Sequence, residues 1–128
     1  MAILTVQILC VEDCEAVGQA IKQFLDASGY KVTIAPTVDT ALAMAKASSF
    51  DLYILDYKLP DGTGIELCRC IRDFDSTTPI LIYSRCIDPQ VNKLALSAGA
   101  QRCLGKGAGP ELLKETVREL LRDQHSDN

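Results

Sequence analysis

The sequence predicts a single α/β domain in which a parallel β-sheet is covered by helices on both faces. The chain has 128 residues, which is the size of one domain. Short apolar runs rich in β-branched residues alternate with segments whose apolar residues recur at helical spacing, which gives five β-then-α units. Strict alternation of this kind is typical of parallel strands with helices packed on both sides of the sheet.

Five apolar runs are predicted to be the strands. Each is short, aliphatic or β-branched, and followed by polar or turn-forming residues. Their sequences are TVQILCV (5–11), KVTIA (31–35), LYIL (52–55), PILIYS (79–84) and QRCL (101–104).

A helix is predicted after each strand, and start and stop signals mark several helix ends. The first helix ends at Gly29, and the second begins at Thr37 or Asp39. The fourth ends at Gly99, and the last carries Pro110 in its first turn. The apolar positions that predict these helices are Val17, Ile21, Phe24 and Leu25; Leu42 and Ala45; Ile65, Leu67, Cys68 and Ile71; Val91, Leu94 and Ala95; and Leu113, Val117, Leu120 and Leu121.

Composition and charge narrow the function before any motif is considered. The net charge of −4 disfavours a nucleic-acid partner, because phosphate backbones select basic surfaces. No apolar run approaches the roughly 20 residues that span a bilayer. The N-terminal segment MAILTVQILCVEDCE lacks the basic leader of a signal peptide. We therefore expect a cytoplasmic protein with no membrane binding and no direct nucleic-acid binding.

Six cysteines and one histidine raise the question of disulfides or a zinc site. A cytoplasmic location disfavours disulfides. No C-x-x-C pair occurs, and Cys68 and Cys70 are spaced to point to different sides of a helix. The histidine, His125, lies in the polar segment RDQHSDN. Most of the cysteines are therefore expected to act as small hydrophobic residues.

Polar residues follow the carboxyl ends of four predicted strands. The first strand ends at Glu12 and Asp13, and the third ends at Asp56. The fourth ends at Ser84, and the fifth stops just before Lys106. Ligands of parallel α/β sheets bind beyond this edge of the sheet. We therefore expect three carboxylates, a hydroxyl and an ammonium to share one rim.

Three neighbouring carboxylates repel one another unless a cation joins them. Mg²⁺ suits such a place, because it takes oxygen ligands and combines carboxylates with phosphate. The set therefore predicts metal-assisted phosphoryl transfer, with Asp56 as nucleophile and with Ser84 and Lys106 holding phosphoryl oxygens. Two simpler interpretations stay open: Glu12 and Asp13 could favour a helix N-terminus, and Asp56 could cap a loop.

The chain resembles the receiver domain of bacterial two-component response regulators and is similar to single-domain, chemotaxis-regulator-like receivers. The segments that carry the resemblance are LCVEDCE, ILDYKLPDGTG, ILIYSR and SAGAQRCLGK, in this order. The resemblance extends from the first strand to the last helix and implies the flavodoxin-like (βα)5 fold. It implies a receiver domain over residues 1–123 and a polar C-terminal tail over residues 124–128.

The resemblance also implies roles for the rim residues. Asp56 would accept a phosphoryl group from a histidine kinase or phosphotransfer protein, and Ser84 and Lys106 would contact that group. The domain would assist its own phosphotransfer and dephosphorylation and would not be an enzyme in the usual sense. Its docking surface would then change for a downstream protein target or a covalently linked output domain. A homodimer through the face of the fourth helix, fifth strand and fifth helix is a further option.

A magnesium site is the second implication of the resemblance. Asp13, Asp56 and the backbone carbonyl of Lys58 would ligate Mg²⁺, and Glu12 would help through water. Pro60 and the glycines after it would let the loop turn tightly and bring the backbone near Lys58 to the ion.

Several positions bear on how a receiver with this sequence works. Receivers usually carry proline after the lysine, whereas this chain has Gly107, for which we expect a trans peptide bond and a looser loop. They also carry an aromatic residue three positions before the lysine, where Cys103 is too small to act as the lever that reports phosphorylation. Lys58 and Cys86 occupy positions that tune phosphoryl lifetime. The departures favour one alternative, a receiver-fold interaction module that no longer signals by phosphorylation.

Overall fold

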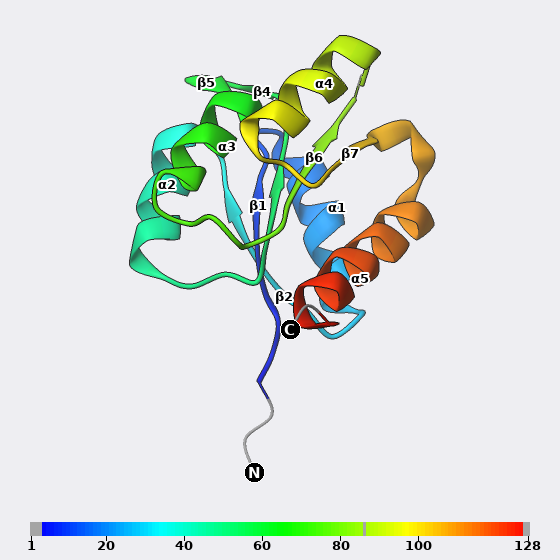
Figure 1. Cartoon of the computed structure of the whole chain (residues 1–128). Coiled ribbons are helices and arrows are strands. Elements are labelled where there is room, and N and C mark those ends of the chain that lie inside the picture. The colour runs from blue at the N-terminus through cyan, green and yellow to red at the C-terminus, as the bar shows by residue number, and fades with distance from the viewer. Residues whose placement is uncertain (1–3, 86, 127–128) are drawn as a thin grey trace.

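A computed structural model describes residues 4–85 and 87–126. These residues form a five-stranded sheet, a separate two-stranded hairpin and five α-helices (Figure 1). In chain order the elements are β1 (Gln7–Val11), α1 (Glu15–Asp26), β2 (Lys31–Ala35), α2 (Val38–Ala47), β3 (Leu52–Leu55), β4 (Lys58–Leu59), β5 (Gly62–Thr63), α3 (Gly64–Arg72), β6 (Ile80–Ser84), α4 (Pro89–Ala98), β7 (Arg102–Gly105), the 3₁₀ helix η1 (Lys106–Ala108) and α5 (Pro110–Ser126).

The large sheet confirms the predicted parallel topology. Its strand order is β2-β1-β3-β6-β7, and every neighbouring pair is parallel. The chain runs from β1 outward to β2 and then crosses back to β3 on the other side of β1. Strand order therefore reverses between β1 and β3, and the crevice at their carboxyl ends is where ligands of this fold class bind.

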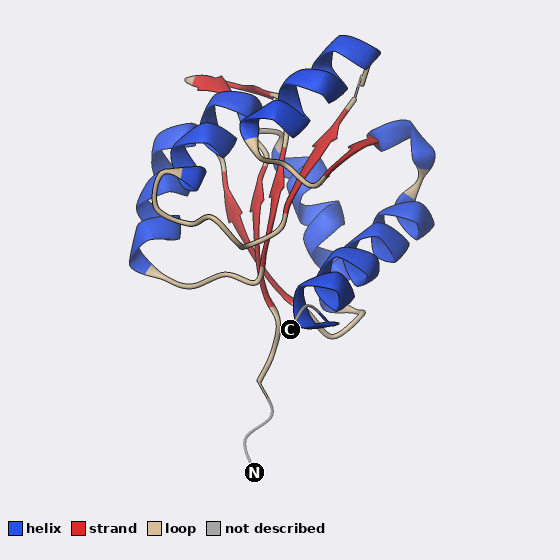
Figure 2. Cartoon of the chain, in the orientation of Figure 1, coloured by secondary structure: helices blue, strands red, loops and turns tan. Residues whose placement is uncertain are grey.

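Helices cover both faces of this sheet (Figure 2). On one face, α2, α3 and α4 pack on Leu9, Tyr53 and Ile82 with their buried neighbours. On the other face, α1 and α5 pack on side chains that include Ile8 and Leu81. The central strands β1, β3 and β6 are thus buried on both sides, which explains why they are continuous apolar runs rather than alternating ones.

Most helix ends follow the sequence signals, although α1 ends at Asp26 and not at Gly29. Thr37 is the N-cap of α2, and its hydroxyl oxygen accepts a hydrogen bond from the Thr40 backbone N–H at 3.1 Å. Gly99 ends α4 in the left-handed conformation, with φ of 110°, which glycine adopts without strain. Pro110 is the first residue of α5. The strand bounds differ from the prediction by one or two residues, since β1 begins at Gln7 and β7 ends at Gly105.

The cysteines lie both in the core and at the surface. The structure describes five of them: Cys10 and Cys68 are buried, Cys103 is half-buried, and Cys14 and Cys70 are exposed. Cys10, Cys68 and Cys103 are buried or pack against the core, so the expectation that most cysteines act as small hydrophobic residues holds for three of the five described ones. Cys14, just before α1, and Cys70, on α3, are the exceptions. The opposite exposure of Cys68 and Cys70 is as predicted. Cys86 lies outside the described residues.

Two further observations concern the C-terminal helix and membrane-spanning segments. Helix α5 continues to Ser126, and the division between domain and tail at residue 123 stays a prediction. Within the part of the chain that the structure describes, no helix combines the length and apolar character needed to cross a membrane.

Candidate functional site

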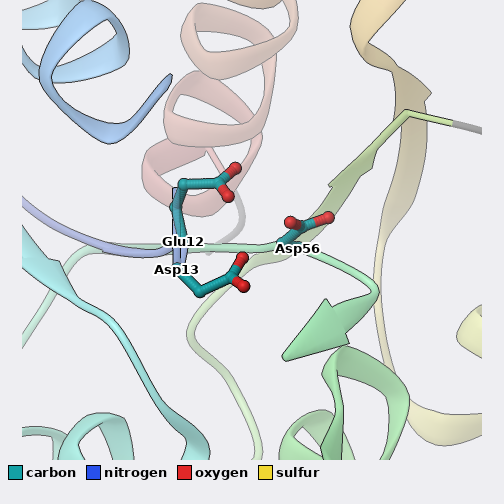
Figure 3. Close-up of side chains that lie close together, drawn as sticks. All are labelled: Glu12, Asp13 and Asp56. Atoms are coloured by element: carbon teal, nitrogen blue, oxygen red, sulfur yellow. The ribbon is translucent and has the colours of Figure 1, made fainter. Parts of the chain in front are cut away.

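The three predicted carboxylates meet at the carboxyl edge of the sheet. Strands β1 and β3 pair so that Val11 lies opposite Leu55, and the residues that follow each strand are therefore neighbours. One oxygen from each of Glu12, Asp13 and Asp56 lies within 4.8 Å of the others (Figure 3). The sheet topology thus brings together acids that are more than 40 positions apart.

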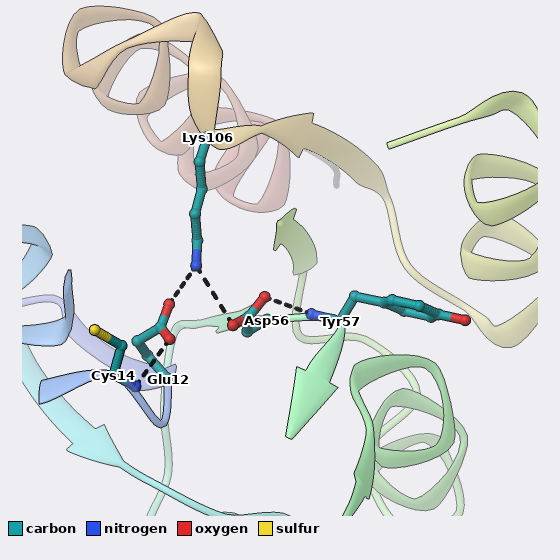
Figure 4. Close-up of polar contacts among 5 residues, drawn as sticks. All are labelled: Glu12, Cys14, Asp56, Tyr57 and Lys106. Atoms are coloured by element: carbon teal, nitrogen blue, oxygen red, sulfur yellow. Dashed lines mark hydrogen bonds and ion pairs between the residues drawn. The ribbon is translucent and has the colours of Figure 1, made fainter. Parts of the chain in front are cut away.

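Lys106 reaches into this cluster from the far side of the rim (Figure 4). It opens η1 directly after β7. Its ammonium nitrogen lies 2.5 Å from Oε1 of Glu12 and 3.4 Å from Oδ2 of Asp56. The ammonium therefore bridges two of the three carboxylates and is closer to Glu12.

Burial governs the electrostatics of this pair. The Glu12 side chain is 3% exposed, and its burial raises the pKa of the carboxyl; the Asp56 charge adds to the rise, while Lys106 and the Cys14 N–H oppose it. For Lys106, burial by itself lowers the pKa, but the hydrogen bond to Glu12 and the charge of Asp56 outweigh it and raise the pKa. Burial is thus the main reason that the pKa of Glu12 is raised, whereas the pKa of Lys106 is raised by its two carboxylate partners, Glu12 and Asp56.

The predicted site residues line one hollow of about 570 Å³. All six of them do so: Glu12, Asp13, Asp56, Lys58, Ser84 and Lys106. Ser84 ends β6 opposite Gly105 and is 6% exposed. The hollow is also lined by Tyr57, Arg85 and Asp88, which the sequence argument does not single out. Tyr57 directly follows Asp56, and Arg85 directly follows Ser84. Their positions just after strand ends are therefore a signal that could have identified them.

The backbone after Asp56 is held by an unusually close approach. The Gly64 N–H donates a hydrogen bond to the Tyr57 carbonyl at 2.7 Å. A Cβ atom on Gly64 would lie 2.1 Å from the carbonyl oxygen of Asp56, which no side chain can tolerate. Glycine is therefore required at this position because there is no space for a Cβ atom. The tight turn that the sequence predicts is a β4–β5 hairpin with Pro60 and Asp61 at its tip.

The two simpler interpretations describe real local contacts. Oε2 of Glu12 accepts a hydrogen bond from the Cys14 N–H at 3.1 Å, just before α1 begins. Oδ1 of Asp56 accepts one from the Tyr57 N–H at 2.8 Å, while the Tyr57 ring extends away from the carboxylates (Figure 4). Each of these carboxylates uses its other oxygen toward Lys106, so local capping does not consume the site.

The donor set fits a hard divalent cation. It consists of carboxylate oxygens gathered within 4.8 Å of one another, and Lys58 lines the same hollow. Oxygen ligands of this kind suit Mg²⁺ or Ca²⁺ and disfavour soft metals. The uncompensated negative charge at the cluster provides the electrostatic reason for a cation to bind.

The positions that depart from the receiver pattern are both described. No cis peptide bond occurs among the described residues, so the bond between Lys106 and Gly107 is trans, as expected. Cys103 is half-buried on β7 and packs against the core cluster beneath α2, α3 and α4, where burial raises the pKa of its thiol.

Fold and site together define a flavodoxin-like α/β domain with an acidic pocket, a hydroxyl and a lysine at its carboxyl edge. The response regulator receiver domain model matches residues 8–118, and the chain belongs to this family.

Similar proteins agree with this assignment. The KDP operon transcriptional regulatory protein KdpE of Escherichia coli is 36% identical over 93% of this chain and 52% of its own length. The sensor histidine kinase AruS of Pseudomonas aeruginosa is 30% identical over 93% of this chain and 12% of its own. The chain thus spans about half or less of these curated relatives. A CheY-like response regulator receiver domain protein from Methanospirillum hungatei has a TM-score of 0.93 at 30% identity, covering 98% of this chain and 100% of the other.

Proposed function

We propose that this receiver accepts a phosphoryl group on Asp56 from a histidine kinase or a phosphotransfer protein. The observation that carries the proposal is the placement of Asp56 in an acidic cluster, with the Lys106 ammonium 3.4 Å from one of its oxygens. Family membership supports the same assignment. In the transfer, a carboxylate oxygen of Asp56 forms a bond to phosphorus, the bond between phosphorus and the donor's imidazole nitrogen breaks, and the electron pair leaves with that nitrogen.

The residues around Asp56 have distinct parts in this step. Asp13, Asp56 and the Lys58 carbonyl would hold Mg²⁺, with Glu12 acting through water. When bound, the ion would offset the charge of the carboxylates and of the phosphoryl oxygens. Lys106 would turn from Glu12 to a phosphoryl oxygen, a short movement for a long side chain. The Ser84 hydroxyl would donate a hydrogen bond to another phosphoryl oxygen.

The response would pass from Ser84 to the surface around α4. A movement of Ser84 toward the phosphoryl group would pull on the segment that leads from β6 to α4. Two large apolar side chains on α4, Leu94 and Leu96, are 39% and 48% exposed, which supports α4 as part of a docking surface. Its partner would be a downstream protein, a linked output domain or a second copy of this chain. With Cys103 in place of the aromatic lever, we expect Ser84 to carry the signal.

The alternative is an interaction module that no longer signals by phosphorylation. The complete set of acids, hydroxyl and lysine in one hollow argues against it, since a module without phosphoryl chemistry gains nothing from clustered, mutually repelling carboxylates. We further propose a cytoplasmic location and no direct nucleic-acid binding, in keeping with the acidic composition.

Mass spectrometry after incubation with Mg²⁺ and acetyl phosphate tests the proposal. We expect one added phosphoryl group on the wild-type protein and none on Asp56→Asn. Asp73→Asn is the matched control, because Asp73 is an exposed aspartate at the opposite end of α3, and it should be labelled like the wild type. Labelling of Asp56→Asn at another residue, or unchanged labelling in excess chelator, would contradict the mechanism.

A further inference from the structure

Asp61, at the tip of the β4–β5 hairpin, makes a contact that the proposed phosphoryl chemistry does not use. Its two carboxylate oxygens accept hydrogen bonds from the first two N–H groups of α2: Oδ1 from Val38 at 2.8 Å and Oδ2 from Asp39 at 3.0 Å. These partners are 23 and 22 positions away in sequence. The first N–H groups of a helix have no partner within the helix, and a carboxylate there also meets the positive end of the helix dipole. These hydrogen bonds hold the pKa of Asp61 below its usual value.

The hairpin that carries Asp61 also carries Lys58. Lys58 pairs with Thr63, and Leu59 pairs with Gly62 across the two strands. The base of the hairpin is closed by the hydrogen bond from the Gly64 N–H to the Tyr57 carbonyl. A two-stranded hairpin is marginally stable by itself, and one that is held at its base alone can pivot about that base.

Contact with α2 restrains this pivot. A Cβ atom on Gly62 would lie 3.3 Å from a methyl group of Val38, so the hairpin backbone lies close to α2. The Asp61 carboxylate adds two directed, charge-assisted hydrogen bonds at the tip. The strand bearing Lys58 is therefore fixed at both ends, and α2 itself is fixed by packing on the core beneath it.

We propose that Asp61 is a positioning residue for the metal site: it ties the hairpin to α2 and thereby holds the Lys58 carbonyl in place for the divalent ion. The inference rests on the proposed function in one respect, the use of that carbonyl as a ligand. Asp61 is not part of the cluster of Glu12, Asp13 and Asp56, so it would act through the hairpin backbone and not as a ligand. Groups that orient metal ligands affect metal affinity by about 10- to 100-fold, and the effect of Asp61, transmitted through one hairpin strand, should lie at the lower end of this range.

The structure offers a matched control on the same helix. The hydroxyl of Thr37 accepts a hydrogen bond from the third N–H of α2, that of Thr40, at 3.1 Å, and within the described part of the chain it makes no hydrogen bond to the hairpin. Thr37→Ala thus weakens the start of α2 as Asp61→Ala does, but leaves the hairpin tip attached. Asp61→Asn is a milder variant, because its amide oxygen still accepts one of the two hydrogen bonds.

The experiment is a calorimetric titration of the full chain with Mg²⁺, together with phosphorylation rates at low and saturating Mg²⁺. We expect Asp61→Ala to raise the Mg²⁺ dissociation constant about tenfold, Asp61→Asn to raise it less, and Thr37→Ala to change it less than twofold. The phosphorylation rate of Asp61→Ala should recover at saturating Mg²⁺, since the acceptor itself is intact.

The possible results distinguish failure of the role of Asp61 from failure of the proposed function. Equal Mg²⁺ affinity in Asp61→Ala and the wild type would overturn the inference alone. An equal loss in Asp61→Ala and Thr37→Ala would also overturn it, since the cause would be a weakened helix. If Asp61→Ala does not fold, the same comparison is made with Asp61→Asn. Failure of the wild-type protein to bind Mg²⁺ would overturn the proposed function as well.

Discussion

Replacing Asp13 with asparagine should stabilise the protein when divalent ions are removed. Asp13 shares the rim with Glu12 and Asp56, and oxygens of the three acids lie within 4.8 Å of one another. Lys106 pairs with Glu12 and Asp56, whereas Asp13 forms no ion pair with any of the described residues. The substitution keeps the shape of the side chain and removes its negative charge.

The size of the effect follows from the distance and the exposure. Two unit charges 4.8 Å apart repel by about 3.5 kcal/mol at an effective dielectric constant near 20 and by about 0.9 kcal/mol in bulk water. Because Asp13 is exposed, the lower value applies, and the ammonium of Lys106 offsets part of the repulsion between the other two acids. We expect a gain of about 1 kcal/mol, or roughly 4 °C in Tm for a chain of this size.

Thermal unfolding followed by circular dichroism, in chelator and in excess Mg²⁺, measures this effect. In chelator the Asp13→Asn variant should melt above the wild type. In excess Mg²⁺ the order should reverse, because ion binding stabilises the wild-type protein by mass action and the variant has lost a ligand. Asp73→Asn should melt like the wild type in both buffers. An Asp13→Asn variant that melts at or below the wild-type temperature in chelator would refute the repulsion argument.

Two glycines near the site should respond to alanine in opposite ways. Gly64→Ala should lower the free energy of unfolding by about 4 kcal/mol or more, because the added Cβ would lie 2.1 Å from the Asp56 carbonyl oxygen. Urea unfolding should show this loss. A free energy of unfolding within about 1 kcal/mol of the wild type would be inconsistent with the close approach. Gly107→Ala should instead gain about 0.4–1 kcal/mol, since a Cβ there meets no atom within 4 Å and φ is not in the left-handed range. The same titration measures it, and a loss of stability would mean that Gly107 needs a conformation other than the one described.

The fold was predictable because its main signal is local. The central strands β1, β3 and β6 are apolar runs buried on both faces, and each helix has a periodic apolar stripe. Strict alternation of the two leaves parallel pairing as the arrangement that buries them all. Once the sheet is parallel, the carboxyl ends of its strands share one edge. That rule alone placed Glu12, Asp56, Ser84 and Lys106 together.

Contacts between segments that are distant in sequence had to come from the tertiary structure. The sequence placed Lys106 at the rim, but its distances of 2.5 Å to Glu12 and 3.4 Å to Asp56 depend on where η1 starts and how its side chain packs. The turn after Asp56 carries signals for a bend and none for a hairpin, nor for the lack of space that requires Gly64.

Asp61 shows the physical reason most clearly. Within LPDGTG it is an ordinary turn residue, and nothing beside it indicates a partner. Its partners, Val38 and Asp39, are the free N–H groups of a helix that precedes it by more than 20 residues. Composition and periodicity determine which segments become strands and helices. The pairing of a polar side chain with a distant backbone group depends on how those elements pack in three dimensions. No local sequence pattern encodes how close two such groups come in the folded chain.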